Sequence, residues 1–198
     1  RGVLPSALGR PCYPSRMVDL PPLDHIVARR TLAVASARLG EEPVVALQGA
    51  RAVGKSTLLG QLASSAGTRV LDLDDLALRD AVQAAPAGFV AGPSPVCIDE
   101  YQHAPAILDA IKSELNRDLR PGRFLLTGST RHDALPVAAQ SLTGRLHLLA
   151  VWPLSQGEIA GTYEDLLEVL FSDPSATASS AAAGSTKLDY IAWISRGG

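Results

Sequence analysis

The residue types and spacing of a phosphate-binding loop, G-x-x-x-x-G-K-[ST], occur once, at Gly49-Ala50-Arg51-Ala52-Val53-Gly54-Lys55-Ser56-Thr57. Gly49 and Gly54 permit positive φ and close backbone approach, so successive N–H groups can face phosphate oxygens. A helix beginning near Gly54 adds unpaired N–H groups and the positive end of its dipole. We expect all nine residues to line the nucleotide phosphates. Lys55 should reach the β- and γ-phosphates, and Ser56 rather than Thr57 should be a ligand of Mg²⁺.

The surroundings of this loop also fit the motif. The apolar run 43–47 precedes it and reads as a buried strand, and residues 56–63 follow with helical spacing. A chance match in a glycine-containing turn needs neither neighbour. The strand–loop–helix context therefore favours phosphate binding.

A second group of polar residues follows the apolar run 95–98. Asp99 could hold Mg²⁺ through its water shell, and Glu100 could orient and polarise a water for attack on the γ-phosphate. The alternative is that both acids cap the next helix. After the next strand, 124–126, either Thr127 or Ser129 could touch the γ-phosphate or the attacking water, unless these hydroxyls only cap a turn.

Composition sets limits on the class of protein. The chain has 198 residues, 46% hydrophobic and 19% charged, with a net charge of −2, which suits one packed domain and provides no overall attraction to nucleic acid. Nucleic-acid binding is therefore unsupported by charge. No apolar run approaches the ~20 residues of a membrane span. Cys12 and Cys97 form no disulfide framework or metal pattern, which favours the cytoplasm.

Strands and helices are expected to alternate along the chain. Helical spacing predicts a helix over 23–39 that stops at Gly40, and Asp74 is expected to cap a helix over 76–82. The remaining predicted elements are strands at 44–47, 70–73, 96–98, 124–126 and 146–151, and helices at 56–63, 104–115, 136–142, 155–159 and 163–171. Short, almost wholly apolar strands between helices indicate a parallel α/β sheet that is covered on both faces.

The two ends of the chain differ in character from the middle. Residues 1–16 contain three prolines and no sustained periodicity, so we predict a disordered extension, and Met17 could be the true start. We place the core at 17–171. Residues 172–186 are rich in Ala and Ser and are typical of a flexible linker. Residues 187–198 then read as the beginning of a truncated further domain.

Taken together, these motifs resemble a bacterial and archaeal family of AAA-type ATPases within the P-loop class that carries a catalytic glutamate. Members join this ATPase core to a C-terminal domain of unknown function. The matching segments, which include the Walker A and Walker B motifs, span about residues 25–170. They are Gly49–Thr57, Leu71-Asp72-Leu73-Asp74-Asp75, Ile98-Asp99-Glu100-x-Gln102, Phe124–Ser129, Leu142-x-Gly144-Arg145 and Trp152-Pro153-Leu154-Ser155-x-Gly157-Glu158.

The resemblance implies a three-layer α/β/α sandwich of the P-loop NTPase type, with about five strands in the order 5-1-4-3-2, and hydrolysis of ATP with Mg²⁺. It suggests Thr127 or Ser129 as a polar sensor and Arg145 as an arginine that stabilises charge. If Arg145 acted in trans, a homo-oligomer would be required. The alternative is that Arg145 forms an ordinary salt bridge. An unknown protein partner would be engaged through the C-terminal domain. Ala50 and Ala52 depart from the family's usual Pro and Gln, but neither change removes a phosphate ligand.

Three functions therefore compete. The leading hypothesis is an ATPase whose hydrolysis drives a conformational change in an attached domain or oligomer. A non-catalytic, nucleotide-gated binding module would need the same loop but no turnover. A P-loop kinase acting on a small molecule would need an acceptor site; against it, the pair Asp99–Glu100 suits activation of water, and no Arg-rich lid is evident.

Overall fold

The structure is a computed structural model that describes residues 26–129 and 142–161, together with positions 167, 170, 171, 186–188 and 191. The residues discussed below belong to one compact unit, Val27–Asp165. Arg1–Ile26 and Leu166–Gly198 group separately. The predictions for 1–16, 172–185 and most of 187–198 fall outside the described residues, as does most of each helix predicted at 136–142 and 163–171.

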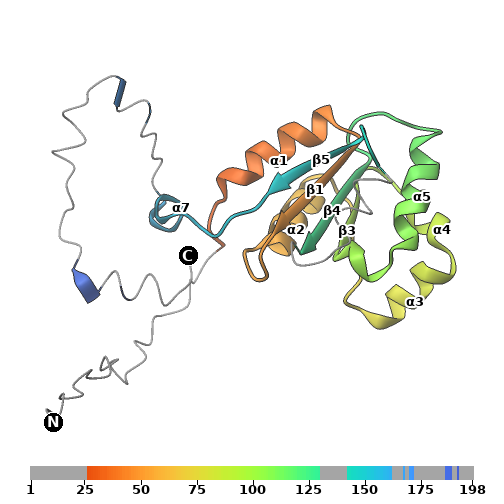
Figure 1. Cartoon of the computed structure of the whole chain (residues 1–198), viewed down its shortest axis with the longest axis horizontal. Helices are drawn as coiled ribbons and strands as arrows, with labels where there is room; N and C mark the ends of the chain where they lie inside the picture. Colours follow the sequence, from red (N-terminus) through yellow and green to blue (C-terminus); the bar gives the residue numbers. More distant parts are fainter. Residues whose placement is uncertain are drawn as a thin grey trace, which may run out of the picture. The chain divides into compact units, whose positions relative to one another are not determined.

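A single parallel sheet organises the unit. Its strands are β1 (Val44–Gly49), β2 (Val70–Asp72), β3 (Val96–Asp99), β4 (Phe124–Ser129) and β5 (Leu146–Ala150), in the spatial order β2-β3-β4-β1-β5 (Figure 1). This is the predicted order, 5-1-4-3-2. Strand β1 pairs with β4 and β5, and its last residue, Gly49, lies opposite Ser129. The carboxyl ends of β1, β3 and β4 thus meet at one edge of the sheet.

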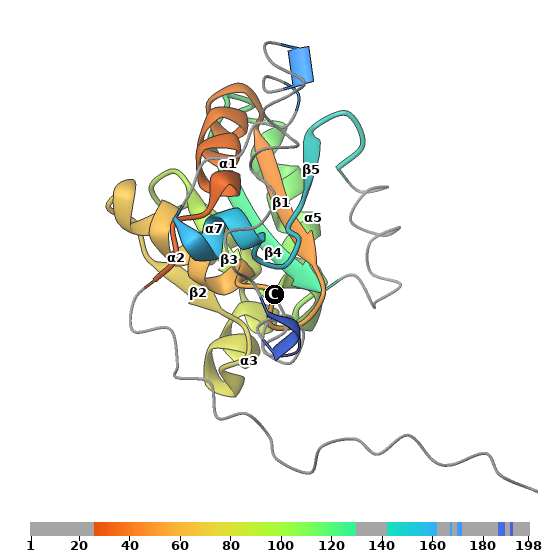
Figure 2. The same ribbon diagram turned by 90° about the vertical axis from the view of Figure 1, so that its left-hand side faces the viewer.

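Helices cover the two faces of this sheet. The helices are α1 (Arg30–Glu41), α2 (Lys55–Ser65), α3 (Leu76–Ala84), α4 (Pro86–Val90), the 3₁₀ turn η1 (Tyr101–His103), α5 (Ala106–Leu115) and α7 (Gln156–Ala160). α1 and α2 lie on one face and α3, α4 and α5 on the other (Figures 1 and 2). The unit Val27–Asp165 is therefore the three-layer α/β/α sandwich that the sequence predicts.

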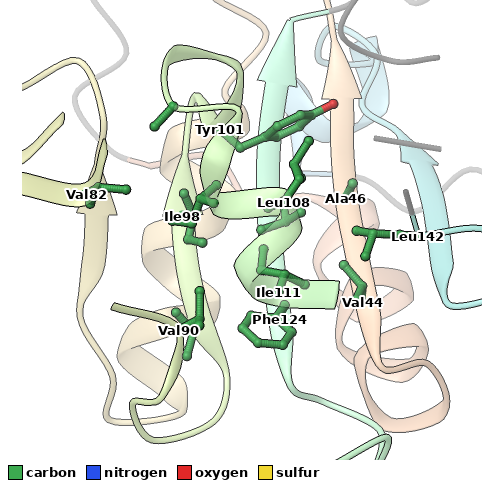
Figure 3. Close-up of a cluster of buried hydrophobic side chains, with 14 of the residues drawn as sticks. Val44, Ala46, Val82, Val90, Ile98, Tyr101, Leu108, Ile111, Phe124 and Leu142 are labelled. Atoms are coloured by element: carbon green, nitrogen blue, oxygen red, sulfur yellow. The ribbon is translucent and has the colours of Figure 1, made fainter. Parts of the chain in front are cut away.

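Alternate residues of each strand build the two cores. Along β1, Val44 and Ala46 pack with α5, whereas Val45 and Leu47 pack with α2. Figure 3 shows the first of these clusters, in which Phe124 lies beneath Ile111. Because β1, β3 and β4 are buried on both faces, most of their positions are apolar, and that explains their hydrophobic runs.

Two local predictions about helix starts were wrong. α1 begins at Arg30, seven residues later than predicted, and it ends at Glu41, so Gly40 lies within its last turn. Its first amide, Arg30 N, is capped by Glu158 Oε1 at 2.8 Å, far along the chain. α3 is capped by Asp75, whose side chain accepts from Ala77 N and Leu78 N, and not by Asp74.

None of the helices within the described residues combines the length and the apolar character that crossing a membrane requires.

Candidate functional site

The glycine-rich loop joins β1 to α2 in a tightly constrained path. A Cβ on Gly49 would lie 2.2 Å from the carbonyl oxygen of Val151, so no larger residue fits there. Gly54 is left-handed, with φ of 90°, and Lys55 begins α2 directly after it. Ser56 and Thr57 are exposed on the first turn of that helix. Fixed glycines and a helix start thus place the loop amides at the carboxyl edge of the sheet.

Lys55 holds the loop from within. Its side chain is only 5% exposed, and its Nζ donates to the carbonyl oxygens of Gly49 at 3.2 Å and Ala50 at 2.9 Å. A buried ammonium needs such acceptors, because desolvation without them is costly. Lys55 is therefore already directed into the loop that the sequence assigns to phosphate.

The carboxylates after β3 are joined to β4 through Thr127. This fully buried hydroxyl donates to Asp99 Oδ1 and accepts from Glu100 N, the latter at 3.1 Å. Each of its hydrogen-bonding roles is thereby used within the protein. Thr127 is consequently placed to position the two acids, and a direct contact from its hydroxyl to a phosphate would compete with these bonds.

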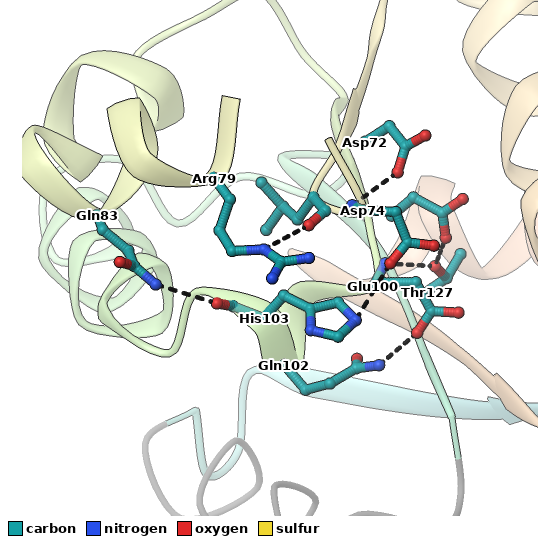
Figure 4. A network of polar contacts seen from close by, with 10 residues as sticks. Asp72, Asp74, Arg79, Gln83, Glu100, Gln102, His103 and Thr127 are labelled. Carbon is teal, nitrogen blue, oxygen red and sulfur yellow. Dashed lines mark hydrogen bonds and ion pairs between the residues drawn. The ribbon is translucent and has the colours of Figure 1, made fainter. Parts of the chain in front are cut away.

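Glu100 turns away from the strand that precedes it. Its backbone is left-handed, with φ of 52°, and its side-chain Oε2 accepts from Gln102 Nε2 (Figure 4). Ala52 and Glu100 are the non-glycine residues with positive φ among those the structure describes, and both lie in this site. Such conformations carry a strain of ~1–3 kcal/mol and cluster at functional positions.

A second polar chain flanks the acids (Figure 4). Asp74, after β2, meets His103 Nε2 at 3.2 Å, and His103 O accepts from Gln83 of α3. Asp72 is engaged locally by the amide of Asp74 at 2.9 Å. These contacts connect η1 to the neighbouring β2–α3 turn. They account for Asp74 and Asp72 as structural residues.

Tyr101 supports the turn that carries Glu100 and Gln102. Its ring covers Gly128, and its hydroxyl bonds to the Gln48 side chain. Burial raises the pKa of Tyr101 above its ordinary value, although the bond to Gln48 opposes this shift. The phenol therefore stays neutral and acts as a buried anchor for η1.

Substitution of Gly128 tests this packing. A Cβ there would lie 2.7 Å from Tyr101 Cε1 and 3.1 Å from Gln102 Oε1, so Gly128→Ala must displace these side chains of η1. We expect it to lower the free energy of unfolding by about 1–3 kcal/mol, as overpacking does. Gly60→Ala in α2, where nothing lies within 4 Å, is the control and should stabilise by up to about 1 kcal/mol. Equal effects of the two substitutions on urea unfolding would contradict this account.

The role of Thr127 can be tested by removing its hydroxyl alone. Thr127→Val leaves an Asp99 oxygen and the Glu100 amide without this partner, so we expect a loss of about 1–3 kcal/mol in the free energy of unfolding. Thr127→Ser keeps the hydroxyl and should recover most of that loss. If the valine variant were as stable as the parent in urea titrations, the buried contacts of Thr127 would not matter.

The structure does not bring every predicted residue to this edge. Arg145 immediately precedes β5 at the opposite, amino edge, and its Nη1 donates to Asn116 Oδ1 at 2.8 Å. Within its own chain it therefore cannot stabilise charge at the loop, so only a role in trans is left as a prediction. Ser129 ends β4 opposite Gly49, but its side chain lies outside what the structure describes.

A comparison with family models decides the family. The AAA domain model matches residues 41–160, which includes the loop, the Asp99–Glu100 pair and Thr127. The chain belongs to the AAA domain family. Its fold is that of a P-loop nucleotide-binding protein, from a class of enzymes that hydrolyse nucleotides or transfer their phosphoryl groups.

Sequence relatives of this AAA domain include uncharacterized proteins of Mycobacterium bovis and Mycobacterium tuberculosis. Each is 32% identical over 145 residues, which is 72% of this chain and 32% of the relative. The chain thus spans about a third of the length of these relatives. A shikimate kinase from Acinetobacter baumannii in complex with shikimate is similar over 80% of this chain and 93% of its own, with 18% identity and a TM-score of 0.31. Similarity at that level does not distinguish between functions.

Sequence reasoning missed one cation beside the loop of the AAA domain. Arg29 lies before α1, and its Nη1 donates to the carbonyl oxygen of Val53 in the loop at 3.1 Å. No motif marks Arg29, and the expected helix over 23–39 placed it on an ordinary amphipathic surface. Gln48 and Tyr101 were also passed over, because their pairing depends on strand register.

Proposed function

We propose that this AAA domain binds ATP with Mg²⁺ and hydrolyses it to ADP and phosphate. The observation that carries the proposal is the fixed placement of Glu100. Thr127 holds the backbone of Glu100, and Gln102 holds its carboxylate. Glu100 follows β3, which is separated from the loop strand β1 by β4 alone. A carboxylate held in this way can accept a proton from a water aligned with the γ-phosphate.

The residues of the loop supply binding. The amides of residues 50–56 would hold the phosphate oxygens, and Lys55 would exchange its bonds to Gly49 and Ala50 for the β- and γ-phosphates. Charge-assisted bonds to phosphate are stronger than those to a neutral carbonyl, which favours this exchange. Arg51 is exposed in the loop and takes no part in the contacts of Lys55.

The oxygen donors near the loop are of the kind that Mg²⁺ prefers. No three His, Cys, Asp or Glu side chains converge as a metal site in the parts of the chain that the structure describes. Ser56 and Asp99 would therefore hold the ion together with water and phosphate oxygens, an arrangement that Mg²⁺ accepts because it retains several waters. When bound, Mg²⁺ would neutralise charge that develops on the phosphates.

Hydrolysis is further proposed to drive a conformational change in an attached domain or in an oligomer. One observation supports it: the chain spans only 32% of the length of its curated relatives, which have room for further domains. Arg145, which bonds to Asn116, would take part only at a site of another subunit. An Arg145→Ala variant mixed with a Glu100→Gln variant would reveal such sharing as restored phosphate release.

The product of the reaction tests the proposal. Incubation with γ-labelled ATP and Mg²⁺ should yield free phosphate in the absence of any acceptor. Label transferred to a small molecule from a metabolite extract, with no release in its absence, would favour a kinase. Nucleotide binding without either product would favour a nucleotide-gated module.

A further inference from the structure

Arg29 makes an unusual set of contacts for a residue outside every motif. Its Nη1 donates to Val53 O at 3.1 Å, and its Nη2 donates to Trp152 O at 2.5 Å. Its Nε lies 3.5 Å from Glu158 Oε1, and the two side chains are only 10% and 7% exposed. A cation buried to this extent requires fixed partners. One guanidinium thus joins the segment before α1, the glycine-rich loop and the segment after β5.

The contact with Val53 fixes the direction of a peptide in the loop. A trans peptide is planar, and its carbonyl and N–H point to opposite sides. Since the Val53 carbonyl is turned to Arg29, the N–H of Gly54 must face away from the guanidinium. The guanidinium also lies beside Gly54, because a Cβ there would be 3.9 Å from Nη1. Gly54 directly precedes α2, where the loop amides converge on an anion.

Two cations bind the carbonyl oxygens of the loop. Lys55 binds those of Gly49 and Ala50, and Arg29 binds that of Val53. Lys55 is proposed to exchange its carbonyls for phosphate oxygens. Arg29 is held by Trp152 and Glu158 as well, so it can keep the Val53–Gly54 peptide in place whether or not nucleotide is bound.

Glu158 is itself fixed as an anion. Burial alone raises the pKa of Glu158, but bonds from the amides of Ser155 and Arg30, together with the charges of Arg29 and Arg30, outweigh burial and lower it. The ionised form is therefore fully populated at neutral pH, and its contribution to stability is lost only as the pH falls through the lowered value. Assays near pH 7.5 keep the ion pair with Arg29 intact.

We propose that Arg29, held by Glu158, is a positioning residue of the phosphate-binding loop, which orients the Gly54 amide toward the nucleotide phosphates. This inference rests on the proposed nucleotide binding. If Arg29 has this role, the segments before α1 and after β5 help to set the affinity for nucleotide.

Titration calorimetry with ADP and Mg²⁺ at pH 7.5 tests the proposal. Arg29→Ala should raise the Kd for ADP by about 10- to 100-fold, the worth of the charged hydrogen bonds it removes. The matched control is Arg38→Ala in α1, which breaks an exposed ion pair with Glu41 and should leave the Kd unchanged within about twofold. For hydrolysis, KM should rise far more than kcat falls.

Two further variants separate positioning from folding. Arg29→Lys keeps the positive charge but loses the planar guanidinium with its several N–H donors. Its Kd for ADP should therefore lie between those of the parent and of Arg29→Ala. Glu158→Gln removes the negative charge that faces Arg29 and keeps an oxygen for only one of the two amides, because Arg30 N and Ser155 N bond to different oxygens of Glu158. It should also weaken the binding of ADP. Each titration is run at a temperature well below the Tm of the variant. That Tm is measured in the absence of nucleotide.

The outcomes distinguish the inference from the function beneath it. If the parent chain binds ADP and a folded Arg29→Ala or Glu158→Gln variant binds it equally well, the positioning role is overturned and the nucleotide site stands. If the parent chain itself fails to bind ADP and ATP, the proposed function falls and the inference with it. Weakened binding in both variants, with Arg38→Ala unaffected, supports the role.

Discussion

Glu100→Gln is expected to retain ATP binding and to lower phosphate release by at least about 100-fold, since a positioned general base contributes roughly 10²–10⁴ in rate. The amide keeps an oxygen that can accept from Gln102, and the backbone bond from Glu100 N to Thr127 does not depend on the side chain. The geometry should therefore survive while the proton acceptor is lost. Phosphate release and ATP affinity, measured on the same preparation, check this expectation.

Glu41→Gln provides the control for that experiment. Glu41 is an exposed carboxylate at the end of α1 that pairs with Arg38, and it lies shortly before β1, toward the amino edge of the sheet. Its loss should leave turnover unchanged. Undiminished phosphate release from Glu100→Gln would remove Glu100 from the mechanism.

Lys55→Ala is expected to weaken nucleotide binding itself by about 100-fold. The charged bonds to phosphate are each worth roughly 1.5–3 kcal/mol, and the loop also loses the donor that holds Gly49 and Ala50. Lys55→Met preserves much of the apolar stem and separates the loss of charge from the loss of packing. Both variants should bind ADP and ATP weakly in calorimetric titrations.

A lysine elsewhere on the domain controls for general charge effects. Lys112 is exposed in the last turn of α5, and Lys112→Ala should leave nucleotide affinity unchanged within about twofold. Full affinity in both Lys55 variants would contradict the placement of phosphate at the loop.

Much of the fold follows from local pattern. Strands β1, β3 and β4 are largely apolar because both of their faces are buried, so the positions of the strands and their parallel sheet could be predicted. The loop and the Asp99–Glu100 pair could be predicted because their chemistry requires particular residue types at fixed spacing. Thr127 emerged only as one of two candidates. Its contacts with Asp99 and Glu100 required the register of β3 against β4.

Other parts of the site depend on contacts between distant segments. The start of α1 is set by Glu158, which caps Arg30 N from 128 residues away, so no local signal marks it. The same carboxylate holds Arg29 against the loop, a role that periodicity cannot reveal. Gly128 is required by the ring of Tyr101, although its place in an apolar strand gave no reason for a glycine.

The most direct test of the account is thermal unfolding of the chain with and without ATP and Mg²⁺, with phosphate release followed in the same samples. At a ligand concentration a hundredfold above Kd, binding should add about 2.7 kcal/mol of stability. For a chain of this size, that corresponds to a rise in Tm of about 5–10 °C. The account predicts this rise together with steady release of phosphate. An unchanged Tm at millimolar ATP, with no phosphate released, would contradict it.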